Sequence, residues 1–350
     1  MINDKKLKQE SGYQSTNIQG QTVNVYQGLT YSDAKEIALD VFKSNFIQLK
    51  SEAAKIAAER AEEITESILS KLSDKAPETL KEFEQPAMQD ALYTAQKEFA
   101  KSGDKDLGDL LVDIVVDRAK VTKRNMLQIV LDESLLIAPK LTVEQLDTLT
   151  LSFLLTRTKM LNIQNYASFV QYLKNQVFPF VDNVRTEHEH FNYLEYLRCG
   201  HVRMGNYGEL ENNFRRDYKG IFSRGFSREE LVTEFGENSP LLAMTTKSFL
   251  DEGKIQLLNV DSNIISEVVL KMIKFDQKPK LDEFIERTSM VAEEIKEHLK
   301  SVDPKMQKIF EIWKDSEFNQ FELSQVGIAI AHANYRRRTT LSMDLSIWIK

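Results

Sequence analysis

The sequence predicts a mainly α-helical protein: a helical bundle with a short N-terminal β-segment and a small α+β, winged-helix-like C-terminal unit. Only 13 glycines and 7 prolines occur in 350 residues, so few positions interrupt helices. Apolar residues recur at helical spacing over most of the chain. Short stretches near the two ends alternate apolar and polar residues instead, as strands do.

The first fourteen residues are polar and are expected to form a disordered arm. They contain three lysines but no apolar stretch after them, so they are not a signal peptide. No run of 18 or more apolar residues occurs, which predicts no transmembrane helix. The single cysteine, Cys199, excludes an intrachain disulfide framework and fits a reducing cytoplasm.

Residues 15–28 form the β-segment, with Ile18, Val23 and Val25 as its apolar side chains. An isolated hairpin of this size is marginal in water. We therefore expect copies of the chain to associate through these three residues, giving a homo-oligomer that is a trimer or higher. The alternative is a hairpin that packs on its own domain.

A single long helix is expected next, starting at a capping box of Thr30 with Asp33 and ending near Leu72. It would span roughly 60 Å. Its spacing is near 3.6 residues per turn rather than a sustained heptad, so it is either a bundle strut or a short coiled-coil stem. It leads a helical domain over residues 29–180.

Helix-capping and helix-breaking residues mark the ends of the following helices. One begins near Pro86 and ends at Gly103, and Asp104 caps the next. A strongly apolar helix over 126–138 stops at Pro139. A capping box of Thr142 with Gln145 begins another.

Residues 181–350 are expected to form a mostly helical α+β domain, after a boundary between about 178 and 188. A helix is predicted over 241–250 and a strand over 255–260. The C-terminus reads as a strand, a Ser324 N-cap, a short helix, a basic turn and a closing strand over 343–349. That order resembles part of many winged-helix modules.

Three of the five histidines and the cysteine lie close together in sequence: His188, His190, Cys199 and His201. Zn²⁺ sites usually space their ligands as Cys-x₂₋₄-Cys or His-x₃₋₅-His, and these pairs are spaced differently. The sequence therefore predicts no metal site here, but surface histidines and a buried Cys199.

Catalytic motifs are also weak. The glycines of the second half do not form a dinucleotide or phosphate-binding loop, so no cofactor is expected. Glu252 and Lys254 form a Glu-x-Lys pattern of the kind metal-dependent nucleases use. Here the pattern follows a predicted helix instead of lying on a strand.

Arg336, Arg337 and Arg338 are the candidate nucleic-acid contact, because consecutive cations can bind phosphates. The competing interpretation is a solvated basic turn near a helix C-terminus, where cations are favoured. The net charge of −7 opposes non-specific binding to DNA or anionic membranes.

Several segments carry a family resemblance: Ser15 to Gln19, Val23 to Val25, Gly28 to Tyr31, Ala38 to Lys43, Gln96 to Ala100, Tyr218 to Phe226, Val326 to Ala331 and Ser346 to Ile349. Through them the chain resembles a family of uncharacterised bacterial proteins over nearly its whole length. Its C-terminal part is also loosely similar to bacterial abortive-infection proteins. The resemblance implies a cytosolic bacterial protein linked to phage defence and carries over no active-site residues.

These observations favour a non-enzymatic, homo-oligomeric, cytoplasmic protein that senses or binds another macromolecule of the phage or host. One alternative is a nucleic-acid-binding regulator that uses the C-terminal unit. Another is a metal-dependent nuclease that uses Glu252.

Overall fold

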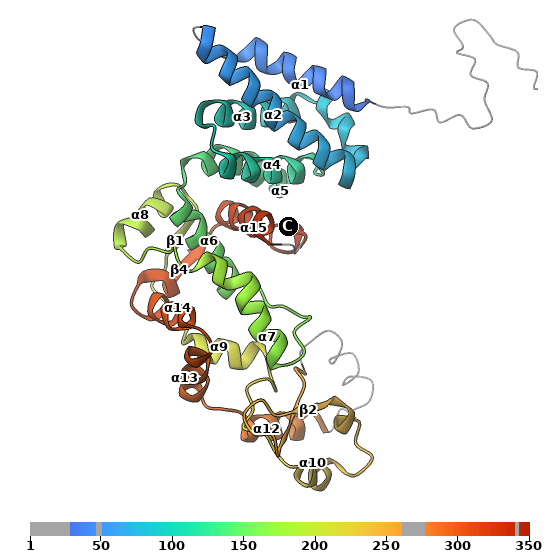
Figure 1. The fold of residues 1–350 in the computed structure, drawn as a ribbon, viewed down its shortest axis with the longest axis vertical. Helices are drawn as coiled ribbons and strands as arrows, with labels where there is room; N and C mark the ends of the chain where they lie inside the picture. Colours follow the sequence, from blue (N-terminus) through green and yellow to red (C-terminus); the bar gives the residue numbers. More distant parts are fainter. Residues whose placement is uncertain (1–28, 47–50, 261–276, 340–342) are drawn as a thin grey trace, which may run out of the picture.

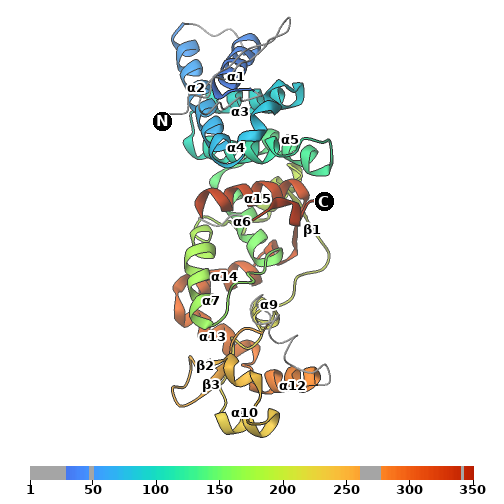
Figure 2. The same cartoon turned by 90° about the vertical axis from the view of Figure 1, so that its right-hand side faces the viewer.

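The computed structural model describes residues 29–46, 51–260, 277–339 and 343–350, and within them the protein is mainly α-helical. The molecule is elongated, with three regions along its long axis (Figure 1). The chain starts in a helical bundle, crosses a central region, forms a small distal region and returns to the centre. Its last helix therefore lies beside the first region (Figure 2).

The N-terminal bundle consists of α1 (Tyr31–Asn45), α2 (Ser51–Lys75), a 3₁₀ segment (Pro77–Glu84), α3 (Pro86–Ser102), α4 (Lys105–Ala119) and α5 (Met126–Ile137). The N-terminal capping residues predicted from the sequence are confirmed. Thr30 and Asp33 form a capping box, and the Asp104 carboxylate accepts from the backbone at the start of α4. Gly103 ends α3 with a left-handed φ of 63°, a conformation that favours glycine.

The predicted single helix from Thr30 to about Leu72 is wrong, because α1 and α2 are separate helices that pack side by side. α1 ends where Phe46 takes an extended backbone, with φ −76° and ψ 140°. The two helices run antiparallel: Lys35, near the start of α1, lies 2.8 Å from Glu66, while Phe42, further on, packs near Ala57. Each helix thus covers the apolar face of the other.

The central region contains α6 (Val143–Thr156), α7 (Tyr166–Tyr172), α8 (His188–Tyr196), α9 (Leu210–Asp217), α13 (Ala292–Val302), α14 (Pro304–Lys314) and α15 (Gln325–Arg338). Its two strands, β1 (Gly200–Val202) and β4 (Phe321–Leu323), pair antiparallel with Gly200 opposite Leu323. The predicted capping box at Thr142 and the Ser324 N-cap are both present.

The predicted closing strand over 343–349 is wrong. Leu345–Ile347 form a 3₁₀ turn, and β4 pairs with β1 instead. Leu345 and Ile349 are buried whereas Ile347 is 61% exposed, so the buried positions are four residues apart, as in a helical turn. The described part of the C-terminus therefore lacks the sheet of a winged helix.

The distal region contains α10 (Arg228–Phe235), β2 (Thr245–Lys247), β3 (Ile255–Leu257) and α12 (Lys278–Thr288). The strand expected over 255–260 is confirmed in part by β3. The helix expected over 241–250 is wrong, because Pro240–Met244 is a 3₁₀ turn that leads into β2. The β-branched pair Thr245 and Thr246 favours a strand, which pairs with β3.

One cluster of buried side chains extends from Ala34 to Ile349, so the bundle and the central region share a hydrophobic core. That core crosses residues 178–188, where the sequence suggested a boundary. The distal region has a cluster of its own around Phe226, Leu231 and Phe284. Within the described ranges, no helix has both the length and the apolar content for crossing a membrane.

The arm over 1–14 and the β-segment with Ile18, Val23 and Val25 lie outside the described residues. Association through that segment stays a prediction.

Candidate functional site

Helix α15 lies between the N-terminal bundle and the central region, where it packs against α4, α5 and α6 (Figure 2). Every residue from Gly327 to Tyr335 is buried. Gly327 allows the closest approach, because a β-carbon there would overlap the carbonyl oxygen of Cys199. The start of α15 is thus fixed against the end of α8 and β1.

The three arginines singled out from the sequence form the last turn of α15, and they do not form a solvated basic turn. Arg336 donates through Nη1 to Asp117 Oδ1 at 2.8 Å and through Nη2 to Asp113 Oδ1 at 3.1 Å. Its side chain is only 12% exposed. Arg337 is 8% exposed and donates to Asp106 Oδ1 at 2.9 Å.

Arg338 points in another direction, toward α6. It pairs with Asp147, donates to the carbonyl oxygen of Pro179 at 2.6 Å and lies over the Phe180 ring at 4.5 Å. Each of the three guanidinium groups thus pairs with at least one carboxylate of the same chain. The predicted exposed basic turn is wrong, and this geometry gives no support to Arg336, Arg337 and Arg338 as a phosphate-binding face.

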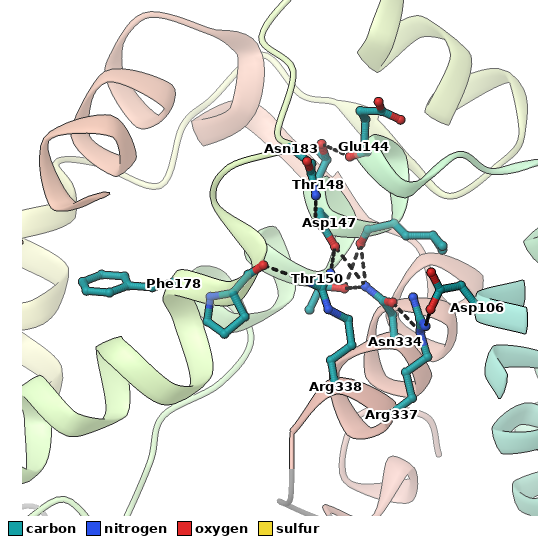
Figure 3. A network of polar contacts seen from close by, with 12 residues as sticks. Asp106, Glu144, Asp147, Thr148, Thr150, Phe178, Asn183, Asn334, Arg337 and Arg338 are labelled. Atoms are coloured by element: carbon teal, nitrogen blue, oxygen red, sulfur yellow. Dashed lines mark hydrogen bonds and ion pairs between the residues drawn. The ribbon is translucent and has the colours of Figure 1, made fainter. Parts of the chain in front are cut away.

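Asp147 is the centre of this network, and Figure 3 shows the polar groups converging on it. Its side chain is fully buried. Asn183 donates to Asp147 Oδ2 at 2.8 Å, while Asn334 of α15 donates to Thr150 Oγ1 at 2.8 Å. Burial raises the pKa of Asp147 above its ordinary value, and the hydrogen bond from Asn183 and the charge of Arg338 oppose that rise.

The acidic partners of Arg336 and Arg337 were not predicted from the sequence, although their spacing on α4 was a usable signal. Asp106, Asp113 and Asp117 are spaced by seven and four residues, which puts them on one face of α4. Asp113 also accepts from Lys71 of α2 at 2.9 Å. A carboxylate face on a helix that is otherwise buried predicts cationic partners, but the sequence does not say which.

The histidine and cysteine residues do not converge. His188 Nδ1 lies 2.8 Å from Glu317, His190 Nε2 lies 2.9 Å from Thr148, and His201 lies 3.9 Å from Glu322. Cys199 is buried, which raises its pKa to about 12. Among the residues that the structure describes, no three His, Cys, Asp or Glu side chains form a group that could hold a metal ion.

The Glu-x-Lys pattern lies in the turn between β2 and β3. Lys254 Nζ is 4.0 Å from Asp251 Oδ2, and both side chains are about half exposed. The backbone N–H of Gly253 donates to Asp251 Oδ1 at 2.9 Å. This is the hydrogen bonding of a tight turn, and it offers no support for a nuclease site.

The fold and the ion pairs of α15 with α4 and α6 define an elongated helical protein. Its C-terminal helix is held in place by these buried pairs. A protein-family model matches residues 28–349, and the chain belongs to that family. The description of the family, ":-like", names no activity. The match begins after residues 15–27, which carried part of the resemblance. No curated protein and no solved structure matches the chain.

Proposed function

We propose that the protein is a non-enzymatic, homo-oligomeric, cytoplasmic protein that acts by binding other macromolecules in bacterial phage defence. The part on defence rests only on the loose resemblance, read from the sequence, of the C-terminal part to abortive-infection proteins. The part on self-association is supported by one observation, an apolar surface on α5, α8 and the first residue of α6.

We call this surface the α5–α8 patch. It comprises six large apolar side chains that are at least 39% exposed: Met126, Ile129, Leu136, Val143, Tyr193 and Tyr196. Exposed apolar side chains scattered singly are normal, but grouped ones mark interaction sites.

Three patch residues lie on α5. Met126, Ile129 and Leu136 are spaced by three and seven residues, which places them on one helix face. The opposite face, with Leu131 and Leu135, is buried in the core. Helix α5 is thus apolar on both sides, and a helix of that kind is normally covered all round.

The other end of the patch lies on α8, which contacts the link between α5 and α6. The Tyr193 hydroxyl donates to the carbonyl oxygen of Lys140 at 3.1 Å, which holds α8 against the link between α5 and α6. The rings of Tyr193 and Tyr196 lie 6.2 Å apart, and Tyr196 is 78% exposed. Tyrosine and methionine are enriched in protein interfaces, where they supply a large contact area.

A second copy of the chain is the proposed occupant of the patch. In this proposal Ile18, Val23 and Val25 bring copies together into a trimer or a higher oligomer. The α5–α8 patch then adds a second contact between neighbouring copies. A phage or host macromolecule would bind the assembled particle.

The test is the native mass of two patch variants, Leu136→Glu and Tyr196→Glu, measured by light scattering. A charge in a desolvated interface is strongly unfavourable, so both variants should lower the mean mass of the particle. Met204→Glu is the matched control, because Met204 is fully exposed and lies outside the patch. Unchanged masses for both patch variants, or an equal drop in the control, would contradict the proposal.

A further inference from the structure

We propose that α5 of one copy packs antiparallel against α5 of a second copy, about a two-fold axis. This inference rests on the proposed self-association and states which contact the α5 part of the α5–α8 patch makes. Met126 lies against Ile129 of the second copy, close to the axis. On either side of the axis, the carboxylate of Glu133 lies beside Lys123 of the second copy.

The exposed stripe of α5 has the spacing of a helix-pairing seam. Met126, Ile129, Glu133 and Leu136 are all exposed, and they follow one another at intervals of three, four and three residues. These intervals are the a/d repeat with which two helices pack side by side. The seam is short, because α5 has 12 residues. The contact therefore adds to the association through the β-segment and does not replace it.

The stripe is presented on a firmly held helix. Leu131 and Leu135, on the opposite face of α5, are buried in the large hydrophobic core. Helix α5 also packs against α4 and α15. Because the helix is already ordered in the single chain, little backbone entropy is lost when a second copy binds to it.

The charges along the stripe favour the antiparallel direction. Lys123 is exposed shortly before α5 begins, and Glu133 is exposed about two turns further along the helix. In a parallel pair, carboxylate would face carboxylate and cation would face cation. In an antiparallel pair, Glu133 of each copy meets Lys123 of the other, and opposite charges across such a seam favour pairing. Arg124 already acts on Asp132 of its own chain, so Lys123 is the cation that the contact uses.

A two-fold contact also determines the parity of the particle. A contact between two identical faces is isologous, so it closes after two copies. Copies that the β-segment joins around a second axis are then connected in pairs, and the particle holds an even number of chains. Loss of the α5 contact should therefore halve the mass of the particle instead of releasing single chains.

Cysteine cross-linking tests the direction of the two helices. The native Cys199 is buried and its pKa is raised to about 12, so mild oxidation leaves it as a thiol. The test variant carries Lys123→Cys together with Glu133→Cys, two positions at least about 12 Å apart along one chain, which is too far for an intrachain disulfide. We expect a covalent dimer of this double variant on a non-reducing gel. Either single variant should cross-link no more than Met204→Cys, which is fully exposed and lies outside the patch.

Charge exchange tests the pairing of Glu133 with Lys123 by native mass. At the lowest concentration at which the wild type keeps its full mass, Glu133→Lys should halve the mass measured by light scattering. Adding Lys123→Glu to that variant restores opposite charges and should restore the mass. Glu252→Lys is the control, because Glu252 is exposed in the turn between β2 and β3. The inference is overturned if Glu133→Lys keeps the full mass, if the control loses as much, or if the double exchange does not recover.

The failure of this inference can be distinguished from the failure of the proposed function. Cross-linking of the single variants, or none in the double variant, overturns the antiparallel α5 contact. Self-association still stands in that case if the native mass of the oligomer depends on Leu136 and Tyr196. A wild-type chain with the mass of one copy overturns both.

Discussion

Arg338, in the last turn of α15, forms an ion pair with Asp147, whose side chain is fully buried in α6. The two residues are 191 positions apart in the chain. Arg336 and Arg337 of the same helix pair with carboxylates of α4. Together these ion pairs connect the C-terminal helix to two regions of the fold. Removal of one of these arginines should therefore cost more stability than removal of an arginine from an exposed turn, because a buried carboxylate would lose its partner.

Replacing Arg338 with Gln should lower the free energy of unfolding by about 3 kcal/mol, because removing one partner leaves the other charge buried. Urea unfolding measures this from the midpoint and slope. Arg224→Gln, which breaks an exposed pair with Glu294, should cost no more than about 1 kcal/mol. Equal losses in the two variants would show that the Asp147 pair is not buried in solution.

Gly327→Ala should be strongly destabilising, by about 3 kcal/mol or more, because the added methyl group overlaps the Cys199 carbonyl oxygen. The backbone of α8 and β1 would have to move away from α15. Gly205→Ala is the control, since a β-carbon there meets no atom within 4 Å. A thermal melt of both variants decides the question. If Gly327→Ala melts as the control does, α15 is not seated this closely against Cys199.

Stability should fall as the pH drops below about 6.5, partly because of His332. This side chain is 1% exposed and lies 2.8 Å from the Met343 carbonyl oxygen. Burial lowers its pKa below the ordinary value of 6.5, and the charge of Arg336 acts in the same direction against Asp113 and Asp117. The unfolded chain therefore binds the proton first. The contribution of neutral His332 is complete above the unfolded pKa and is lost as the pH falls through the folded pKa.

The measurement is the unfolding free energy of His332→Gln at about pH 7.5 and about pH 5, compared with wild type. The variant should lose less stability between the two values than wild type does. His201→Gln serves as the control, because His201 is 56% exposed. An identical pH dependence in wild type and His332→Gln would contradict the assignment.

The paired change Val23→Asp with Val25→Asp should reduce the oligomer and leave the helical content intact. Only three aliphatic side chains are available in residues 15–28, and at about 25 cal/mol per Å² they stabilise little unless several copies bury them together. Circular dichroism checks the helices, and light scattering checks the mass. A variant that keeps the wild-type mass would favour the alternative, in which the segment packs on its own domain.

Local signals in the sequence predicted many of the helix boundaries. Thr142 with Gln145, Asp104 and Ser324 each cap a helix where the sequence placed one. These signals depend on hydrogen bonds between residues two to four positions apart, so they can be read without knowing the fold.

The reversal between α1 and α2 could not be read in the same way. No glycine or proline lies between Asn45 and Ser51, and the apolar spacing continues from one helix into the next. What separates the helices is packing, because folding back lets Phe42 bury against Ala57 and Ala61. That gain depends on tertiary contacts, which override local helix propensity.

The ion pairs of α15 with α4 and α6 could not be predicted from the sequence for a similar reason. Arg336 meets Asp113 across 223 positions of sequence, and nothing local indicates that pairing. Three consecutive arginines at the end of a helix are typical of an exposed basic turn, because arginine is seldom buried unless it is paired. Only the position of α4 and α6 on either side of α15 shows that these three are paired.

Self-association is the central claim, and the native mass of the wild-type full-length chain tests it most directly. One chain has a mass of 40.4 kDa. Light scattering coupled to gel filtration at micromolar concentration should give three or more times that value. A single species with the mass of one chain would contradict the account, because neither the β-segment nor the α5–α8 patch would then be holding copies together.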